Sequence, residues 1–325
     1  MSKYARILVT GGAGFIGSHL CRRFLAEGRQ VRVLDNLDPY YDPAIKRRNL
    51  EELKATGADR FRLIEGDLCE AESVERAAAE VDAVVHLGAL AGVRPSIEAP
   101  VRYMRVNVTG TQILLDALRD RPAVPIVFGS SSSVYGGNVK VPFAETDPVD
   151  HPVSPYAASK KAGEVVCHAF HHLYGHPITC LRFFTVYGPG QRPEMAIHKF
   201  SRHIVGEVPL PFFGDGTSAR DYTFVEDIVD GVVAALERAD GYRIYNLGGA
   251  TPVTLRELVE MLEDTLGRKA VLDRLPDQQG DVPRTHADVS RAGHDLDYRP
   301  KVELAEGLRR FAAWYSIERD AGRLP

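Results

Sequence analysis

Two side chains with acid–base chemistry, Tyr156 and Lys160, are four residues apart in a segment whose apolar spacing predicts a helix. This separation places both side chains on one face of the helix, and Ser154 and Pro155 are residue types that begin helices. A tyrosine with its ordinary pKa of about 10 is a poor base at neutral pH, so its phenolate needs a neighbouring positive charge. The pair therefore predicts a tyrosine that exchanges protons with a substrate and a lysine that stabilises the phenolate.

A glycine-rich turn near the N-terminus predicts a phosphate site. Residues 10–17 have the sequence Thr-Gly-Gly-Ala-Gly-Phe-Ile-Gly and lie between a short apolar strand and an amphipathic helix. Such a turn directs backbone amides and the positive end of the helix dipole at a pyrophosphate. We expect the contacts to come from Gly11, Gly14, Phe15, Ile16 and Gly17.

An acidic residue follows at the separation that dinucleotide sites need. Asp35 comes 35 − 17 = 18 residues after Gly17, close to the separation of about 20 at which a carboxylate meets the adenosine ribose hydroxyls. A carboxylate at this point repels a 2′-phosphate. The sequence therefore favours NAD over NADP.

A run of four serines, residues 130–133, follows another apolar strand and continues as Val-Tyr-Gly. The carboxyl ends of parallel strands meet at one edge of a sheet, so these hydroxyls are expected on the same edge as the glycine turn.

The elements that must position these groups alternate along the chain. Short apolar runs predict strands at residues 6–10, 31–35, 61–65, 82–87, 125–128 and 178–183, and amphipathic spacing predicts helices at 15–27, 71–79, 101–118 and 155–173. This order predicts an α/β fold with a Rossmann-type doubly wound parallel sheet. After residue 185, Pro- and Gly-rich loops predict a smaller C-terminal substrate-binding lobe. We expect the dinucleotide domain to span 1–182 plus about 223–249, and the lobe to span about 183–222 plus 250–325.

Composition excludes several classes of protein. In 325 residues, Lys+Arg 40 against Asp+Glu 44 gives a net charge of −4, so the basic excess of a nucleic-acid binder is missing. No apolar run approaches the roughly 18 residues of a membrane span, and no targeting segment is evident. The cysteines are too widely spaced for a disulfide framework or a zinc site, and we expect no metal and a cytoplasmic location. They are Cys21, Cys69, Cys167 and Cys180.

Together these motifs resemble the extended short-chain dehydrogenase/reductase family. The resemblance implies that Asn36 accompanies Asp35, that Asp67 and Leu68 contact adenine, and that Leu87 and Ala89 line the cofactor. Gly88 departs mildly from the usual Ala between them. The resemblance also selects Ser131, four residues before the tyrosine of the Val-Tyr-Gly step, as the catalytic serine.

The whole chain resembles the nucleotide-sugar epimerase branch, and more narrowly the UDP-glucuronate 4-epimerases. Residues 35–43, 46–48, 91–94, 183–189 and 192–196 carry this match. Thr185 stands where general hexose epimerases usually have Asn, and Gln278 stands where many of them have Arg. The resemblance implies a UDP-sugar substrate, a homodimer formed by helices 101–118 and 155–173, and a UDP clamp that includes Arg220. Implied substrate contacts are Arg94, Ser132, Ser133, Thr185, Arg192, Arg220, Gln278 and Asp281.

The implied substrate poses a chemical problem. Oxidation at C4 of glucuronate gives a ketone β to the C6 carboxylate, and such acids lose carbon dioxide when the breaking bond aligns with the carbonyl π system. The site must hold the carboxylate out of that alignment. Ser132, Ser133 and Arg192 are our candidates for this contact.

Several alternatives stay open at this point. A UDP-glucuronate decarboxylase shares the substrate and the 4-keto intermediate. A UDP-glucose 4-epimerase stays open because one arginine and one threonine decide little against neutral hexoses, and a UDP-N-acetylglucosamine 4-epimerase stays open because the small Thr285 leaves room for a bulkier group. A 4,6-dehydratase is disfavoured because Ser132 and Ser133 replace its Asp-Glu pair. A non-catalytic NAD-binding regulator would need neither Tyr156 nor Lys160.

Two alternatives do not involve NAD. A metal site at His168, His171, His172 and His176 has no clear carboxylate partner, and a serine hydrolase would need a Gly-x-Ser-x-Gly elbow that the sequence lacks.

Overall fold

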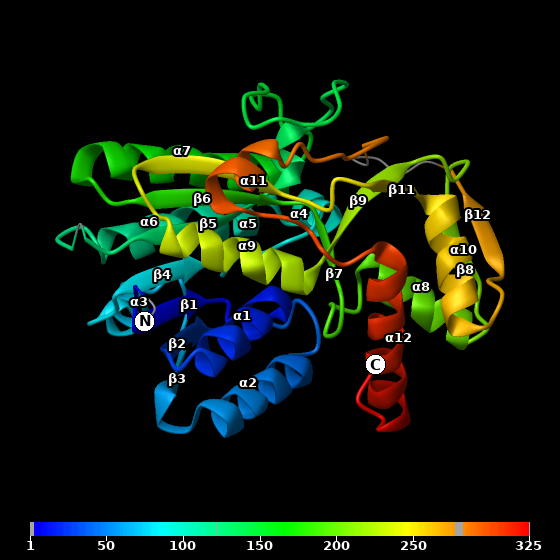
Figure 1. Cartoon of the computed structure of the whole chain (residues 1–325), viewed down its shortest axis with the longest axis horizontal. Coiled ribbons are helices and arrows are strands. Elements are labelled where there is room, and N and C mark those ends of the chain that lie inside the picture. Colours follow the sequence, from blue (N-terminus) through cyan, green and yellow to red (C-terminus); the bar gives the residue numbers. More distant parts are fainter. Residues whose placement is uncertain (1–2, 122, 277–281, 325) are drawn as a thin grey trace.

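The computed structural model describes residues 3–121, 123–276 and 282–324. Its largest element is a seven-stranded sheet in which every neighbouring pair of strands is parallel (Figure 1). The strand order is β10-β6-β5-β4-β1-β2-β3, so the winding reverses between β1 and β4. This confirms the predicted doubly wound sheet. The strands are β1 (Arg6–Thr10), β2 (Gln30–Asp35), β3 (Phe61–Glu65), β4 (Ala83–His86), β5 (Ile126–Ser131), β6 (Ile178–Phe183) and β10 (Tyr242–Leu247).

Helices cover both faces of this sheet. Alternate residues of β1 point to opposite faces, so Ile7 and Val9 pack into one apolar cluster and Leu8 into another. One face carries α1 (Phe15–Ala26), α2 (Pro43–Gly57) and α9 (Val225–Glu237), and the other carries α3 (Ala71–Ala78), α6 (Gly110–Asp116) and α7 (Pro155–Tyr174). Burial on both faces explains why the strands appear in the sequence as continuous apolar runs.

The structure corrects the prediction of one continuous helix over residues 101–118. The segment forms α5 (Pro100–Met104), a π-helical turn (Arg105–Thr109) and α6, and the short α4 (Val93–Glu98) precedes it. Asn107, inside the π turn, bonds with the Leu90 backbone through both its Oδ1 and its Nδ2, and its Nδ2 also donates to Ser159 Oγ. The π-helical turn packs against α7. Its extra residue allows this packing while the Asn107 side chain bonds with the loop after β4.

Helix α7 forms as its sequence predicts. Ser154 Oγ accepts a hydrogen bond from the backbone N–H of Ala157 at 3.1 Å, Pro155 occupies the first turn, and Gly175 ends the helix in the left-handed conformation with φ 75°. A capped, 20-residue helix is a rigid support for side chains that must act together.

The strands after β6, apart from β10, form smaller sheets beside the large one (Figure 1). Strands β7 (Thr185–Tyr187), β9 (Ala219–Phe224) and β11 (Pro252–Thr254) make one, and β8 (Leu210–Phe213) and β12 (Leu272–Leu275) make another. Helices α8 (Ala196–Val205), α10 (Leu255–Leu266) and α12 (Leu304–Asp320) pack in the same region, whereas α11 (Ser290–Leu296) contacts β10 and α9. The division of the chain into two domains stays a prediction.

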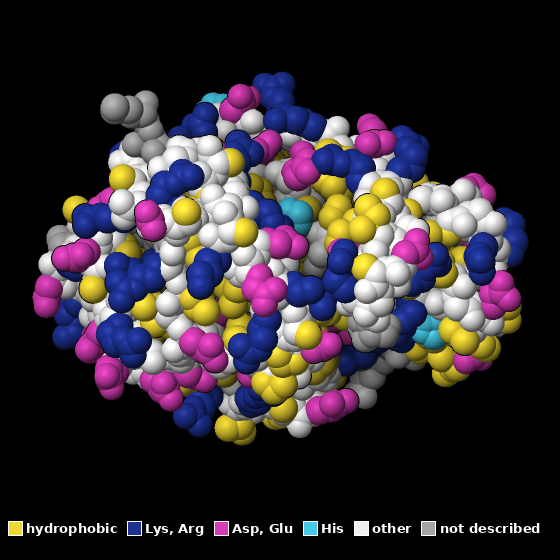
Figure 2. Space-filling view, turned by 90° about the horizontal axis from the view of Figure 1, so that it is seen from below, with side chains coloured by type: hydrophobic (Ala, Val, Ile, Leu, Met, Phe, Trp, Pro, Cys, Tyr) yellow, Lys and Arg dark blue, Asp and Glu magenta, His cyan; other side chains and the backbone are white. Residues whose placement is uncertain are grey.

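Charged side chains of both signs are interspersed over the face shown in Figure 2. This distribution agrees with the small net charge of −4. Among the helices that the structure describes, none combines the length and the apolar character needed to cross a bilayer.

Candidate active site

A cavity of about 380 Å³ lies at the carboxyl ends of the central strands. This is the edge at which a doubly wound sheet binds its ligands, because the winding reverses there. The lining comes from the turn after β1, the ends of β2 and β5, the loops after β3 and β4, helix α7, and the segment after β6. The predicted residues that line it are Gly11, Gly14, Phe15, Ile16, Gly17, Asp35, Asn36, Asp67, Leu68, Leu87, Ala89, Ser131, Ser132, Ser133, Tyr156, Lys160, Thr185 and Arg192.

The glycine turn is tight because its backbone leaves no room for side chains. Gly11 has φ +71°, and a Cβ at Gly17 would lie 2.2 Å from the Gly11 carbonyl oxygen. Helix α1 begins at Phe15, and its N-cap residue is Gly14, which has no side chain to bond the first amides. The first turn of the helix therefore directs its amides into the cleft, where an anion can accept them.

Asp35 ends β2 beside this turn. Its carboxylate accepts hydrogen bonds from the backbone amides of Ala13 at 3.1 Å and Leu37 at 2.9 Å, and Lys46 Nζ lies 3.9 Å away. Burial raises the pKa of Asp35, and the positive charge of Lys46 opposes this shift. Asn36 Nδ2 donates to Asp67 Oδ2 at 2.9 Å, so the predicted adenosine contacts form one group.

Gly88, the departure from the usual Ala, has a structural reason. A Cβ at this position would lie 2.7 Å from Leu68 Cδ1 and 3.0 Å from Thr10 Oγ1. The Gly88 N–H donates to Thr10 Oγ1 at 3.0 Å, and Thr10 Oγ1 lies 2.7 Å from Nδ1 of the buried His86. Burial lowers the pKa of His86 to about 3, so this histidine is neutral and holds the turn by hydrogen bonding alone.

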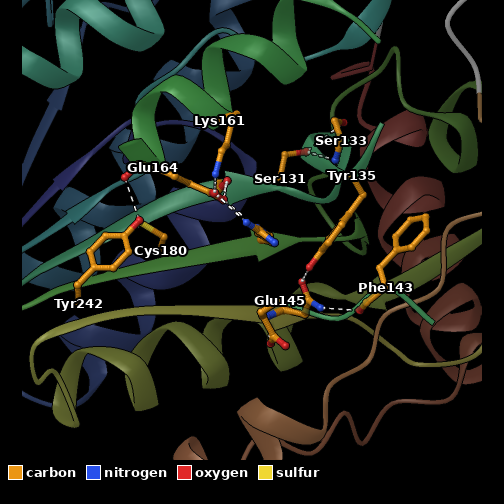
Figure 3. A network of polar contacts seen from close by, with 12 residues as sticks. Ser131, Ser133, Tyr135, Phe143, Glu145, Lys161, Glu164, Cys180 and Tyr242 are labelled. Carbon is orange, nitrogen blue, oxygen red and sulfur yellow. Dashed lines mark hydrogen bonds and ion pairs between the residues drawn. The ribbon is translucent and has the colours of Figure 1, made fainter. Parts of the chain in front are cut away.

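Tyr156, Lys160 and Ser131 meet at the opposite end of the cleft. Lys160 Nζ donates to the Gly129 carbonyl at 2.8 Å, and burial lowers the pKa of its ammonium to about 8. Burial raises the pKa of Tyr156, and hydrogen bonding to the Ser131 hydroxyl opposes the shift. Ser131 Oγ also accepts from the Ser133 amide at 3.2 Å, as Figure 3 shows. The predicted acid–base residues therefore occupy one site.

The predicted sugar-binding residues Ser132, Ser133, Thr185 and Arg192 line the same cavity. Arg192 is the positive charge among them. Its Nε lies 3.2 Å from Glu194 Oε1, and its side chain is 19% exposed, so it is partly shielded from water.

Other predicted substrate residues lie elsewhere. Arg94, at the start of α4, places its guanidinium carbon 5.4 Å from the Phe213 ring centroid, and Arg220 Nη1 donates to the Ala219 carbonyl at 3.0 Å. Thr285 Oγ1 accepts from the Asp221 amide at 3.1 Å. None of these three lines the cavity as the described residues define it. Gln278 and Asp281 lie outside the described residues.

Sequence reasoning assigned no role to several side chains that line the cavity. Tyr40 and Tyr41 come from the loop after β2, Lys46 from α2, and Met195 from the residue before α8. The signal for Tyr40, Tyr41 and Lys46 was the stretch 35–48, in which two tyrosines and several basic residues follow Asp35, and Met195 lies in the matched stretch 192–196. That stretch supported the resemblance, but the sequence did not show that the loop turns back into the cleft.

The histidines of α7 make other contacts. His168 packs edge-on against Tyr242 with ring centroids 5.0 Å apart, and His171 Nδ1 lies 2.6 Å from the His176 carbonyl oxygen. Within residues 3–121, 123–276 and 282–324, no group of three His, Cys, Asp or Glu side chains is arranged to hold a metal ion.

Comparisons with known proteins agree with this geometry. Residues 7–248 match the model of the NAD dependent epimerase/dehydratase family. A UDP-glucuronate 4-epimerase of Thermodesulfobacterium geofontis is 42% identical over 310 residues, covering 94% of this chain and 95% of the relative. UDP-glucuronate 4-epimerase 4 of Arabidopsis thaliana is also 42% identical, in an alignment 330 positions long that covers 95% of this chain and 75% of that protein.

Solved structures show the same fold. The UDP-glucuronic acid 4-epimerase of Bacillus cereus, solved in complex with UDP-glucuronic acid and NAD, superposes with a TM-score of 0.90 at 35% identity, covering 96% of this chain and 99% of that one. The extent of the family match and of these alignments establishes that the chain belongs to the NAD dependent epimerase/dehydratase family.

Proposed function

We propose that this protein is a UDP-glucuronate 4-epimerase, which interconverts UDP-glucuronate and UDP-galacturonate through a 4-keto intermediate. The observation that carries the proposal is that one cavity contains both the Tyr156, Lys160 and Ser131 group and the guanidinium of Arg192. The first group suits oxidation at a sugar hydroxyl, and the second suits a carboxylate on the same sugar. Relatives and solved structures with this activity in their names support the proposal.

The residues of the cleft fit a tightly bound NAD. The uncapped start of α1 would receive the pyrophosphate, and Asp35 would receive the adenosine ribose. When bound, NAD supplies a hydride acceptor that returns the same hydride in each catalytic cycle, so no external reductant is consumed.

The chain's own residues move the proton. The Tyr156 phenolate takes the proton of the sugar 4-hydroxyl, and Ser131 Oγ hydrogen-bonds the same sugar oxygen. The Lys160 ammonium stabilises the phenolate. After the 4-keto sugar turns over within the cleft, Tyr156 gives the proton back to O4, and the configuration at C4 is inverted.

The orientation of the C6 carboxylate must also be fixed while the 4-keto intermediate is present. Arg192, together with the Ser132 and Ser133 hydroxyls, would hold it away from the alignment that releases carbon dioxide. Thr185, which replaces the Asn of general hexose epimerases, would line the space beside it. We assign the UDP group to Arg220, Gln278 and Asp281 in the C-terminal lobe, which we propose as the second domain, together with Arg94 from α4 of the dinucleotide domain.

We further propose that the protein is a homodimer in the cytoplasm. Val101 on α5 is 80% exposed and Val165 on α7 is 54% exposed, and both lie on the helices that the family resemblance assigns to a subunit interface. All four cysteines are free thiols, which supports a reducing compartment. Light scattering of the purified protein would measure its mass, and a Val101→Glu, Val165→Glu variant should be monomeric.

The proposed activity is tested by incubating the purified protein with UDP-glucuronate and catalytic NAD, and following the products by proton NMR. UDP-galacturonate without added reductant is the expected product. UDP-xylose or a UDP-4-keto-pentose would assign decarboxylation instead. Turnover of UDP-glucose or UDP-N-acetylglucosamine in place of UDP-glucuronate would overturn the role of Arg192.

A further inference from the structure

A buried ion pair lies behind the serine segment of the cleft. Arg182 on β6 donates from Nε to Glu164 Oε1 at 2.8 Å and from Nη2 to Glu164 Oε2 at 2.9 Å. Both side chains are 1% exposed. Within the part of the chain that the structure describes, neither of them lines the cavity, so the pair cannot touch the sugar or the cofactor directly.

The pair is joined to the strand that carries Ser131. Ser130 Oγ donates to Glu164 Oε1 at 2.7 Å, and Ser130 is the residue immediately before Ser131 in β5. Glu164 belongs to α7, so the Ser130 hydroxyl ties the end of β5 to this helix. Ser130 itself lines the cavity, and its hydroxyl, held by Glu164, fixes the end of the strand.

Helix α7 contacts two successive residues of β5 in this way. Lys160 Nζ holds the Gly129 carbonyl, and Glu164, one helical turn later, holds the Ser130 hydroxyl. Tyr156, one turn before Lys160, lies on the same face of the helix. One helix face thus carries the proposed base and two contacts to the strand that ends in the proposed catalytic serine.

The same arginine supports the other end of the serine segment. Its guanidinium carbon lies 4.8 Å from the ring centroid of Tyr135, which ends the 3₁₀ turn after Ser131. Tyr135 Oη donates to Asn246 Oδ1 at 2.7 Å, and Asn246 Nδ2 donates to the Phe143 carbonyl at 2.8 Å. Figure 3 shows Ser131 between the Glu164 group and Tyr135, with Ser133 next to Ser131.

Further groups surround Glu164. Lys161 Nζ lies 3.7 Å from Glu164 Oε2, and the Tyr242 hydroxyl donates to the Glu164 backbone carbonyl at 2.9 Å. The planar guanidinium of Arg182 fixes the direction of the carboxylate as well as its distance, because two parallel hydrogen bonds join them.

We propose that Glu164, Arg182 and Ser130 are positioning residues that set the Ser131 hydroxyl against the Tyr156 hydroxyl. This inference rests on the proposed tyrosine-dependent oxidation. Proton transfer requires the reacting atoms at hydrogen-bond distance, and a displacement of about 1 Å can cost on the order of 100-fold in rate. Three side chains from α7, β5 and β6 lock the backbone on one side of Ser131, and Tyr135 locks it on the other.

The test uses Ser130→Ala in the NAD-bound enzyme, because this change removes one hydroxyl and leaves the ion pair intact. Ser201→Ala is the matched control: Ser201 is fully buried in α8, and its Oγ has no hydrogen-bond partner among the described residues. We expect Ser130→Ala to lower kcat for UDP-glucuronate about tenfold and to change KM by less than about twofold, with NAD content and melting temperature similar to those of the control.

Two further measurements separate positioning from a merely structural role. The rising limb of the pH profile of kcat should move to higher pH in Ser130→Ala, because a displaced Ser131 hydroxyl no longer lowers the pKa of Tyr156. The phenolate absorbance of Tyr156, obtained by subtracting the spectrum of the corresponding Tyr156→Phe protein, should show the same shift without any substrate. A double Glu164→Leu, Arg182→Met variant, which removes both buried charges together, should fold and show a larger loss of kcat.

Ser130→Ala with the same kcat, pH profile and Tyr156 titration as Ser201→Ala would overturn the inference. A wild-type protein that does not convert UDP-glucuronate would overturn the proposed function instead. In that case the Tyr156 titration still decides the positioning role, because it needs no substrate.

Discussion

The guanidinium carbon of Arg192 lies 5.5 Å from the centroid of the Tyr40 ring. Tyr40 belongs to the loop after β2, which follows Asp35 and begins with Asn36 at the adenosine end of the cleft. Arg192 belongs to the segment between β7 and α8, at the sugar end. One loop therefore connects the cofactor end of the cleft with the positive charge that we assign to the carboxylate.

Replacing Tyr40 should weaken selection of the uronate. Tyr40→Leu removes the ring that Arg192 faces, and a partly buried cation–π contact contributes about 1–2 kcal/mol, so we expect affinity for UDP-glucuronate to fall about tenfold. Affinity for UDP-glucose should change little, because its sugar has no carboxylate. Calorimetric titration of both nucleotide sugars measures the ratio, and Tyr40→Phe, which keeps the ring, should behave like the wild type. Equal losses for both sugars would refute this role.

Weakening the carboxylate contact should change the product as well as the rate. In Arg192→Ala and Ser132→Ala proteins the 4-keto intermediate has more freedom to align its carboxylate with the ketone, so we expect a decarboxylated UDP-pentose beside UDP-galacturonate. Proton NMR of the reaction mixture reports the ratio of the two products. Undiminished epimerisation without this side product would remove both residues from the role.

Removing the hydroxyl of Tyr156 should lower kcat strongly without loss of bound NAD or of affinity for UDP. General acid–base catalysis contributes about 10²–10⁴ in rate, so kcat of Tyr156→Phe should fall by a factor in this range. The ring remains in place, and the protein should keep its NAD and its affinity for UDP. Steady-state kinetics together with NAD content after purification check both statements; a kcat within about tenfold of wild type would assign the proton transfer to another group.

Lys160 should make the stability of the fold depend on pH. Burial lowers its pKa from the ordinary value of 10.5 to about 8, so between these values the unfolded chain binds more protons than the folded one. The contribution of this group to the free energy of unfolding therefore rises from about pH 8 to about pH 10.5. Below pH 8 this shift lowers the free energy of unfolding by on the order of 3 kcal/mol relative to a lysine with the ordinary pKa.

Denaturant unfolding of the wild type and of Lys160→Met at several pH values measures this effect. Between about pH 8 and pH 10.5, the free energy of unfolding of the wild type should rise relative to that of Lys160→Met. Parallel pH curves for the two proteins would contradict the assignment. Lys160→Met should also lose activity, since the Tyr156 phenolate loses its neighbouring charge.

Asp35 should decide between NAD and NADP. Asp35→Asn keeps the size of the side chain and removes the charge, so we expect NAD to bind about tenfold more weakly and the preference over NADP to shrink. Fluorescence titration of protein freed of its cofactor gives both dissociation constants. A variant that still rejects NADP as strongly as the wild type would show that another group excludes the 2′-phosphate.

Much of the fold follows from local sequence. The strands of the central sheet are buried on both faces, so they are apolar and β-branched throughout, and helix α7 has its cap, its proline and its terminal glycine in order. The glycine turn, Asp35, and the spacing of Tyr156 and Lys160 are local as well. Residues 101–118 are the exception, because Asn107 interrupts the helix through contacts with Leu90 and Ser159, which are distant in sequence.

The tertiary structure decided which distant side chains meet. No periodicity places Tyr40 against Arg192, which are separated by about 150 residues, or joins Glu164 to Arg182 and Ser130 behind the catalytic segment. Such contacts depend on strand order and loop direction, which a single sequence does not encode locally. The sequence by itself determined the chemistry available at the sheet edge, because that chemistry needs particular residue types at short spacing. Packing determined the supports that orient it, because these cross between elements.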